Sequence, residues 1–126
     1  MISLKEALNV HGILIESFGG GEGVRDYALL ESSLLRPYQT FDGQELYPTA
    51  VHKAAAIMES IVKNHPFIDG NKRTGYVLAR LLLMGAGKDI HASEDMKYEL
   101  VIRVSKGEIG FEEIHSWLIK FSVPID

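Results

Sequence analysis

The sequence predicts an all-α fold: a bundle of about six helices around a central buried helix, with one flap or short hairpin. Apolar residues recur at helical spacing along nearly the whole chain. Most of these runs begin after a residue that caps helices and end at glycine or proline. A length of 126 residues fits one domain, which we expect to span residues 1–126.

The first helix is expected to open at Ser3, because Ser3 and Glu6 form a capping box. An apolar stripe then continues to about Phe18. The glycine-rich residues 19–23 end this helix. They have neither a preceding strand nor a Gly-Lys-Ser/Thr ending, so we interpret them as a flexible loop and not as a nucleotide-binding loop.

Asp26 is expected to cap a second helix over residues 27–35. The stretch 36–48 that follows contains Asp42-Gly43, a strong turn signal flanked by apolar and aromatic residues. We therefore predict a loop or short hairpin over the surface.

Thr49 is expected to cap a third helix that reaches Asn64. A fourth helix should run from about Asn71 to Met84, and it is apolar almost all round. A helix of that kind belongs at the centre of a domain, so we predict that the bundle packs around the fourth helix.

Two further helices complete the predicted bundle. Ser93 is expected to cap one that continues to about Lys106, and apolar spacing from Phe111 to Phe121 predicts the last.

Composition excludes several classes of function. The net charge is −4 and no basic stripe is present, so direct nucleic-acid binding is not expected. No apolar run is long enough to cross a bilayer, and the N-terminus does not resemble a signal peptide. The absence of cysteine suits the cytoplasm, where we expect the protein to act.

The most informative segment connects the third and fourth helices. Gly70 permits an unusual backbone conformation, and the helix that starts at Asn71 directs unpaired N–H groups outward. Lys72 and Arg73 then place two cations at a helix N-terminus, where cations are unfavourable. Because a bound polyphosphate would reverse that penalty, the segment is a candidate anion site.

Two further residues of this segment carry candidate chemistry. His65 precedes the turn and is suited to proton transfer near neutral pH. Asp69 is the only carboxylate of the segment, and beside phosphates it would hold Mg²⁺. Each feature alone is more often structural: a capping histidine, an ordinary turn, a solvated basic face. Together they favour phosphoryl or nucleotidyl transfer without saying which.

The segment resembles the signature of the Fic/Doc family, His-Pro-Phe-x-Asp/Glu-Gly-Asn-x-Arg. The matching residues are His65, Pro66, Phe67, Asp69, Gly70, Asn71 and Arg73.

The resemblance implies a role for each of these residues. His65 would be the general base for a target hydroxyl, and Asp69 would coordinate Mg²⁺ on the phosphates of ATP. The anion site would be lined by Gly70, Asn71, Lys72 and Arg73. A flap within residues 38–47 would hold a target segment by strand-like pairing, through Phe41, Asp42, Gly43 and Gln44.

Two departures point to one subgroup of the family. Lys72 replaces the glycine of AMP-transferring members, and Tyr76 replaces their second arginine. Both features resemble the death-on-curing toxins, which phosphorylate a threonine of elongation factor Tu and stop translation. Arg80, one turn beyond Tyr76, would either substitute for the missing charge or extend to solvent from a buried helix.

Within these 126 residues, no Ser or Thr has Glu four residues later, as the self-inhibitory helix of many family members requires. The resemblance therefore implies a separate small antitoxin protein as partner. The first hypothesis is a toxin that is a protein Ser/Thr kinase; the alternatives are an AMP transferase and a non-catalytic anion- or partner-binding module.

Overall fold

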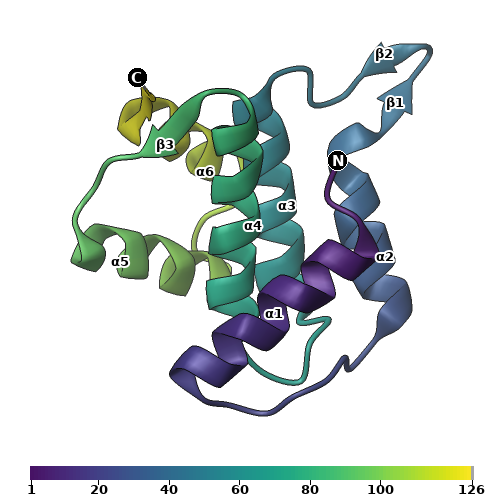
Figure 1. Cartoon of the computed structure of the whole chain (residues 1–126). Helices are drawn as coiled ribbons and strands as arrows, with labels where there is room; N and C mark the ends of the chain where they lie inside the picture. The colour runs from purple at the N-terminus through teal and green to yellow at the C-terminus, as the bar shows by residue number, and fades with distance from the viewer. Residues whose placement is uncertain (126) are drawn as a thin grey trace.

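The structure, a computed structural model, describes residues 1–125. Within them the chain forms six α-helices, one short 3-10 helix (Arg36–Tyr38) and two pairs of short strands (Figure 1). The predicted all-α fold is confirmed. The helices are α1 (Leu4–Phe18), α2 (Tyr27–Leu35), α3 (Ala50–Asn64), α4 (Asn71–Gly85), α5 (Glu94–Ser105) and α6 (Phe111–Phe121).

The predicted helix starts are confirmed by their capping hydrogen bonds. At α1 the Glu6 amide donates to Ser3 Oγ over 3.1 Å, and the Ser3 amide donates to Glu6 Oε1 over 3.2 Å. Side-chain oxygens also accept amide N–H bonds at the first turns of α2, α3 and α5. The capping residues there are Asp26, Thr49 and Ser93.

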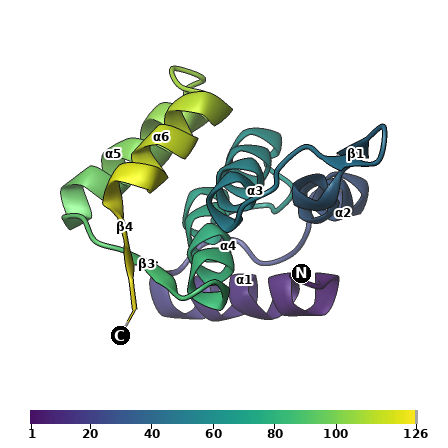
Figure 2. The same cartoon turned by 90° about the horizontal axis from the view of Figure 1, so that it is seen from above.

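The central helix is α3, and the prediction that α4 would hold this place is wrong. Figure 2 shows α3 between the α5–α6 pair on one side and α2 on the other, with α4 beside it. Side chains are buried all round α3, whereas Leu81 and Met84 of α4 remain 41% and 42% exposed. Three consecutive alanines explain the reversal, because small side chains let neighbours approach α3 from several directions. These are Ala54, Ala55 and Ala56, all fully buried.

Helices α3 and α4 pack closely because α4 carries a glycine at the contact. A Cβ at Gly75 would lie 2.7 Å from Val62 Cγ2 and 3.4 Å from Ile61 Cβ. The pair is antiparallel and joined by a short connection, so the C-terminus of α3 and the N-terminus of α4 lie at one end of the bundle (Figure 1). That end holds the candidate site.

The predicted hairpin is present before α3. Strand β1 (Thr40–Phe41) pairs with β2 (Gln44–Glu45), and both turn residues have positive φ, 52° at Asp42 and 76° at Gly43. Two successive positive φ angles are typical of hairpin turns whose twist matches that of the strands. The hairpin projects from the body beside α2 (Figure 1).

A second strand pair was not predicted. Strand β3 (Lys88–Ile90) follows α4 and pairs antiparallel with β4 (Ser122–Pro124), which follows α6. Three-residue strands are too short to show an alternating pattern in the sequence. Among residues 1–125, no helix is both long enough and apolar enough to span a membrane.

Candidate active site

The turn between α3 and α4 is built from two backbone reversals. His65 ends α3 in the left-handed conformation, with φ 51° and ψ 55°, and its amide donates to Ile61 O over 3.3 Å. Gly70 precedes α4 with φ 75°, a conformation that glycine adopts without steric cost. Pro66 keeps the helix from continuing, because a proline disfavours helical geometry in the residue before it.

The buried Asn71 side chain stabilises the turn through two hydrogen bonds. Its Oδ1 accepts the Phe67 amide over 2.9 Å, and its Nδ2 donates to the Phe67 carbonyl over 3.0 Å. Both residues are buried, Phe67 completely. The Asn71 side chain is therefore engaged within the turn, and its backbone N–H has no acceptor among residues 1–125. Asn71 lines the cavity, and its role in anion binding stays a prediction.

The N-terminus of α4 forms the expected electropositive patch. The first helical amide that finds a backbone acceptor is Thr74, which donates to Gly70 O over 3.0 Å. The three amides before it, at positions 71–73, have no acceptor among residues 1–125. Lys72 and Arg73 are exposed in this turn. The Arg73 guanidinium lies 4.3 Å from the centroid of the Phe18 ring, a cation–π contact that holds it over the end of α1.

The imidazole of His65 is held in one useful tautomer. Its Nδ1 lies 3.0 Å from the Lys63 carbonyl. A carbonyl can only accept, so Nδ1 must carry a proton in this hydrogen bond. In the neutral ring Nε2 then has the free lone pair, and the side chain is exposed. This is the arrangement that a general base needs.

Asp69 is oriented by backbone N–H groups from two segments. Its Oδ2 accepts the Gly21 amide over 3.1 Å, and its Oδ1 accepts the Gly70 amide over 2.8 Å. The Gly21 bond is the largest cause of a lowered pKa of the Asp69 carboxyl, the Gly70 bond the next, and Lys72 adds to them. Asp69 is therefore a carboxylate at neutral pH.

The donor set at Asp69 fits Mg²⁺ bound together with phosphates. Each carboxylate oxygen has two acceptor positions and uses one, so acceptor capacity remains. Within residues 1–125 no three His, Asp or Glu side chains gather as a metal-binding group. One protein carboxylate with waters and phosphate oxygens suits Mg²⁺, whereas a structural zinc site would need more ligands.

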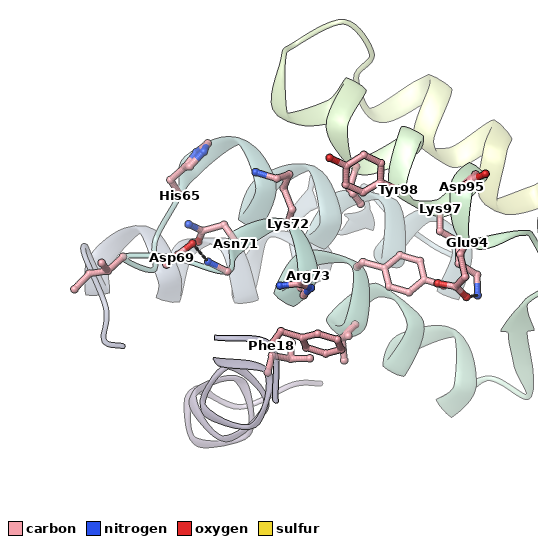
Figure 3. Close-up of a pocket in the computed structure, with 16 residues that line it drawn as sticks. Phe18, His65, Asp69, Asn71, Lys72, Arg73, Glu94, Asp95, Lys97 and Tyr98 are labelled. Atoms are coloured by element: carbon pink, nitrogen blue, oxygen red, sulfur yellow. Dashed lines mark hydrogen bonds and ion pairs between the residues drawn. The ribbon is translucent and has the colours of Figure 1, made fainter. Parts of the chain in front are cut away.

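One cavity of about 690 Å³ unites these parts (Figure 3). His65, Asp69, Lys72 and Arg73 lie on one wall, at the turn and the start of α4. The opposite wall comes from α5. Its contributors are Glu94, Asp95, Lys97, Tyr98 and Val101.

The α5 wall was missed by sequence reasoning. Its residues follow the signature segment by more than twenty positions, and their polar face resembles an ordinary solvated helix surface. Phe18 was likewise expected only as the end of an apolar stripe. Nothing in the spacing indicates that these residues meet the turn, because that contact depends on how α1 and α5 pack.

Comparison with known proteins is consistent with the geometry. A model described as the Fic/DOC family matches residues 1–83. The protein named Toxin Doc from Mycolicibacterium smegmatis is 39% identical over 93 residues, covering 69% of this chain and 72% of that protein. The chain belongs to the Fic/Doc family. The resemblance inferred from residues 65–73 is thereby confirmed.

In this Fic/Doc chain, Arg80 does not supply charge to the cavity. Its guanidinium pairs with both carboxylate oxygens of Asp89, at 2.7 and 2.9 Å, and Arg80 is absent from the cavity lining. The suggested substitute for the missing arginine is therefore wrong. Lys97 lines the cavity instead, beside the Tyr76 hydroxyl. Burial raises the pKa of Tyr76, so its phenol stays neutral.

The Fic/Doc flap lies away from the cavity. Phe41, Asp42, Gly43 and Gln44 are exposed and none of them lines it. The hairpin precedes the N-terminus of α3, whereas His65 ends that helix, about 20 Å away by helix geometry. The role of Phe41, Asp42, Gly43 and Gln44 in target binding stays a prediction.

Proposed function

We propose that this chain is a Doc-type toxin of a toxin–antitoxin system and a nucleotide-dependent transferase. Its reaction would be transfer of the γ-phosphate of ATP to a Ser or Thr hydroxyl of a target protein. The main support is that His65, whose Nε2 has a free lone pair, lines the same cavity as Lys72 and Arg73 in the first turn of α4. The similarity to Toxin Doc supports the toxin assignment.

The site residues would divide the reaction between them. His65 Nε2 takes the proton of the target hydroxyl, whose oxygen attacks the γ-phosphorus while the bond to the leaving ADP breaks. Lys72, Arg73 and the free amides of α4 stabilise the charge on the phosphate oxygens. Asp69 holds Mg²⁺, which supplies charge neutralisation when bound. The products are a phosphoprotein and ADP, and the proton remains on His65.

Lys72 and Tyr76 favour phosphate transfer over AMP transfer. Lys72 puts an extra ammonium on the wall of the cavity, and Tyr76 puts a partly buried neutral phenol where AMP-transferring relatives carry a cation. At the start of α4 a polyphosphate would therefore be held by Lys72 and Arg73, with no cation at position 76.

The test uses purified protein, a bacterial extract, and ATP labelled in either the α or the γ position. The proposal predicts a labelled protein with γ-labelled ATP only, and its loss in His65→Ala. Label from the α position alone would replace the kinase assignment with AMP transfer. Nucleotide binding without any labelled product would indicate a non-catalytic binding module.

The proposed partners are elongation factor Tu as target and a small antitoxin encoded beside the gene. Expression of the chain alone should arrest growth and reduce incorporation of labelled amino acids, and co-expression of the neighbouring reading frame should restore both. His65→Ala should be harmless without the neighbour. Growth arrest that persists in His65→Ala would show that toxicity does not depend on the proposed chemistry.

A further inference from the structure

The segment Gly20–Asp26 runs along the signature turn over its whole length. The Ile68 amide donates to Gly23 O over 3.1 Å, and Val24 forms an isolated antiparallel bridge with Phe67. Next to this bridge, the Arg25 and Asp26 amides both donate to Pro66 O, over 2.7 and 3.0 Å. The segment predicted to begin as a flexible glycine loop is therefore joined to the turn by several backbone hydrogen bonds.

Each end of this segment contacts a residue of the candidate chemistry. At one end, Arg25 donates from Nε to His65 O and from Nη2 to Asn64 O, both over 2.6 Å. This fixes the left-handed backbone from which the imidazole projects. At the other end, the Gly21 amide holds Asp69 Oδ2.

We propose that Gly20–Asp26 is a positioning element for the active site, and that Gly20 and Gly21 set the orientation of the Asp69 carboxylate toward Mg²⁺. This inference rests on the proposed function, since it assigns Asp69 the metal. With the two oxygens of Asp69 held by amides from two segments, Gly21 and Gly70, the carboxylate plane is fixed before any ligand arrives. Such outer contacts on a metal-binding carboxylate commonly change metal affinity by 10- to 100-fold.

Glycine is required at position 20 for two separate reasons. The backbone has φ +119°, which residues with a Cβ rarely adopt. A Cβ there would also lie 2.8 Å from Asp69 Oδ2 and 3.2 Å from Ile15 Cδ1. Gly19 offers a matched control, because it also has positive φ, +82°, but its Cβ would meet nothing within 4 Å.

The experiment compares Gly20→Ala with Gly19→Ala by calorimetric titration of ADP, with and without Mg²⁺. We expect Gly20→Ala to weaken Mg²⁺-dependent ADP binding about tenfold or more and to leave Mg²⁺-free binding unchanged. Gly19→Ala should bind as the unmodified chain does, although its backbone is strained in a similar way. Equal binding by the two variants would overturn the positioning role.

Asp69→Ala separates this inference from the proposed function. If Asp69→Ala leaves Mg²⁺-dependent binding intact, the metal assignment itself is wrong. If Asp69→Ala abolishes that binding and Gly20→Ala matches Gly19→Ala, only the positioning role fails.

Hydrogen exchange gives a second measurement that does not need the Gly20→Ala variant to fold. In Asp69→Ala the Gly21 amide loses its acceptor, so it should exchange faster than in the unmodified chain. The Gly19 amide, which donates to Ile15 O over 2.7 Å, should exchange as before. An unchanged rate at Gly21 would contradict the proposed contact.

Discussion

At the scale of single residues, the site depends on side chains that do not touch the ligand. His65 can present its imidazole only because its backbone adopts a left-handed conformation that costs a β-carbon-bearing residue about 1 kcal/mol. The cost is offset by the Arg25 contacts and by the buried Asn71–Phe67 bonds on either side. The signature thus contains structural residues as well as chemical ones.

Asn71 is the clearest structural member of the signature. Replacing it with alanine removes two hydrogen bonds and leaves the buried Phe67 amide without an acceptor. Asn71→Ala should lower the free energy of unfolding by about 2 to 3 kcal/mol, measured by urea denaturation.

Lys72→Ala is the control for that measurement, because Lys72 is exposed in the same helical turn. It should raise stability by a few tenths of a kcal/mol, since a cation leaves the positive end of the helix. A loss in Asn71→Ala no larger than 0.5 kcal/mol (about the size of an ordinary surface change) would contradict the structural role.

At the scale of helices, the glycine at the α3–α4 contact sets how closely the two helices approach. Gly75→Ala should destabilise the protein by about 1 to 2 kcal/mol, because the added methyl overlaps Val62 and the gain in helix propensity offsets only part of this. Thermal or urea unfolding measures the change. Gly85→Ala, in the same helix with open space around it, should be neutral or stabilising.

A double substitution tests the cause of that effect. Val62→Ala removes the methyl group that the new Cβ would meet. Gly75→Ala combined with Val62→Ala should therefore cost less than the sum of the two single changes. Strict additivity would show that the loss does not come from this contact.

Helix boundaries could be predicted well because their causes are local. Ser3 and Glu6 are three residues apart. The capping bonds at α1, α2, α3 and α5 all join residues at this spacing. The identity of the central helix could not be predicted from the sequence, because it depends on which helix faces pack against other elements. Leu81 and Met84 have the composition of buried residues, yet they remain 41% and 42% exposed.

The same distinction applies to the candidate site. His65, Asp69, Lys72 and Arg73 fall within nine positions, so the turn that joins them could be recognised. Lys97 shares a cavity with this turn only through the tertiary packing of α5, and Gly21 reaches Asp69 across 48 positions.

At the scale of the whole molecule, the ion pair between Arg80 and Asp89 connects α4 to the β3–β4 pair. The pKa of Asp89 is lowered from 3.8 to about 2, chiefly by the hydrogen bond from the Arg80 guanidinium, with the Ile90 amide adding to it. A lowered pKa in the folded state means that the pair stabilises the protein above pH 3.8 and loses this effect as the pH falls through 2.

Arg80→Met should therefore lower stability at pH 7 by about 0.5 to 1 kcal/mol, the modest value of a partly exposed pair. The difference from the unmodified chain should shrink as the pH falls below 3.8, to about half near pH 3, and only a small part of it should remain at pH 2. Urea denaturation at pH 7, 4 and 2 measures it. A difference that stays constant over this range would mean that packing, and not charge, accounts for the loss.

The two walls of the cavity come from different parts of the chain, and this division has a consequence for evolution. Within residues 1–125 no hydrogen bond joins α5 to residues 65–73, and α5 lies beyond the part of the chain that the family model matches. Substitutions at Tyr98 or Asp95 would thus reshape the space for an incoming molecule and leave the reacting groups as they are. Under the proposed function, descendants of one ancestor would in this way diverge in what they modify while inheriting the same reacting groups.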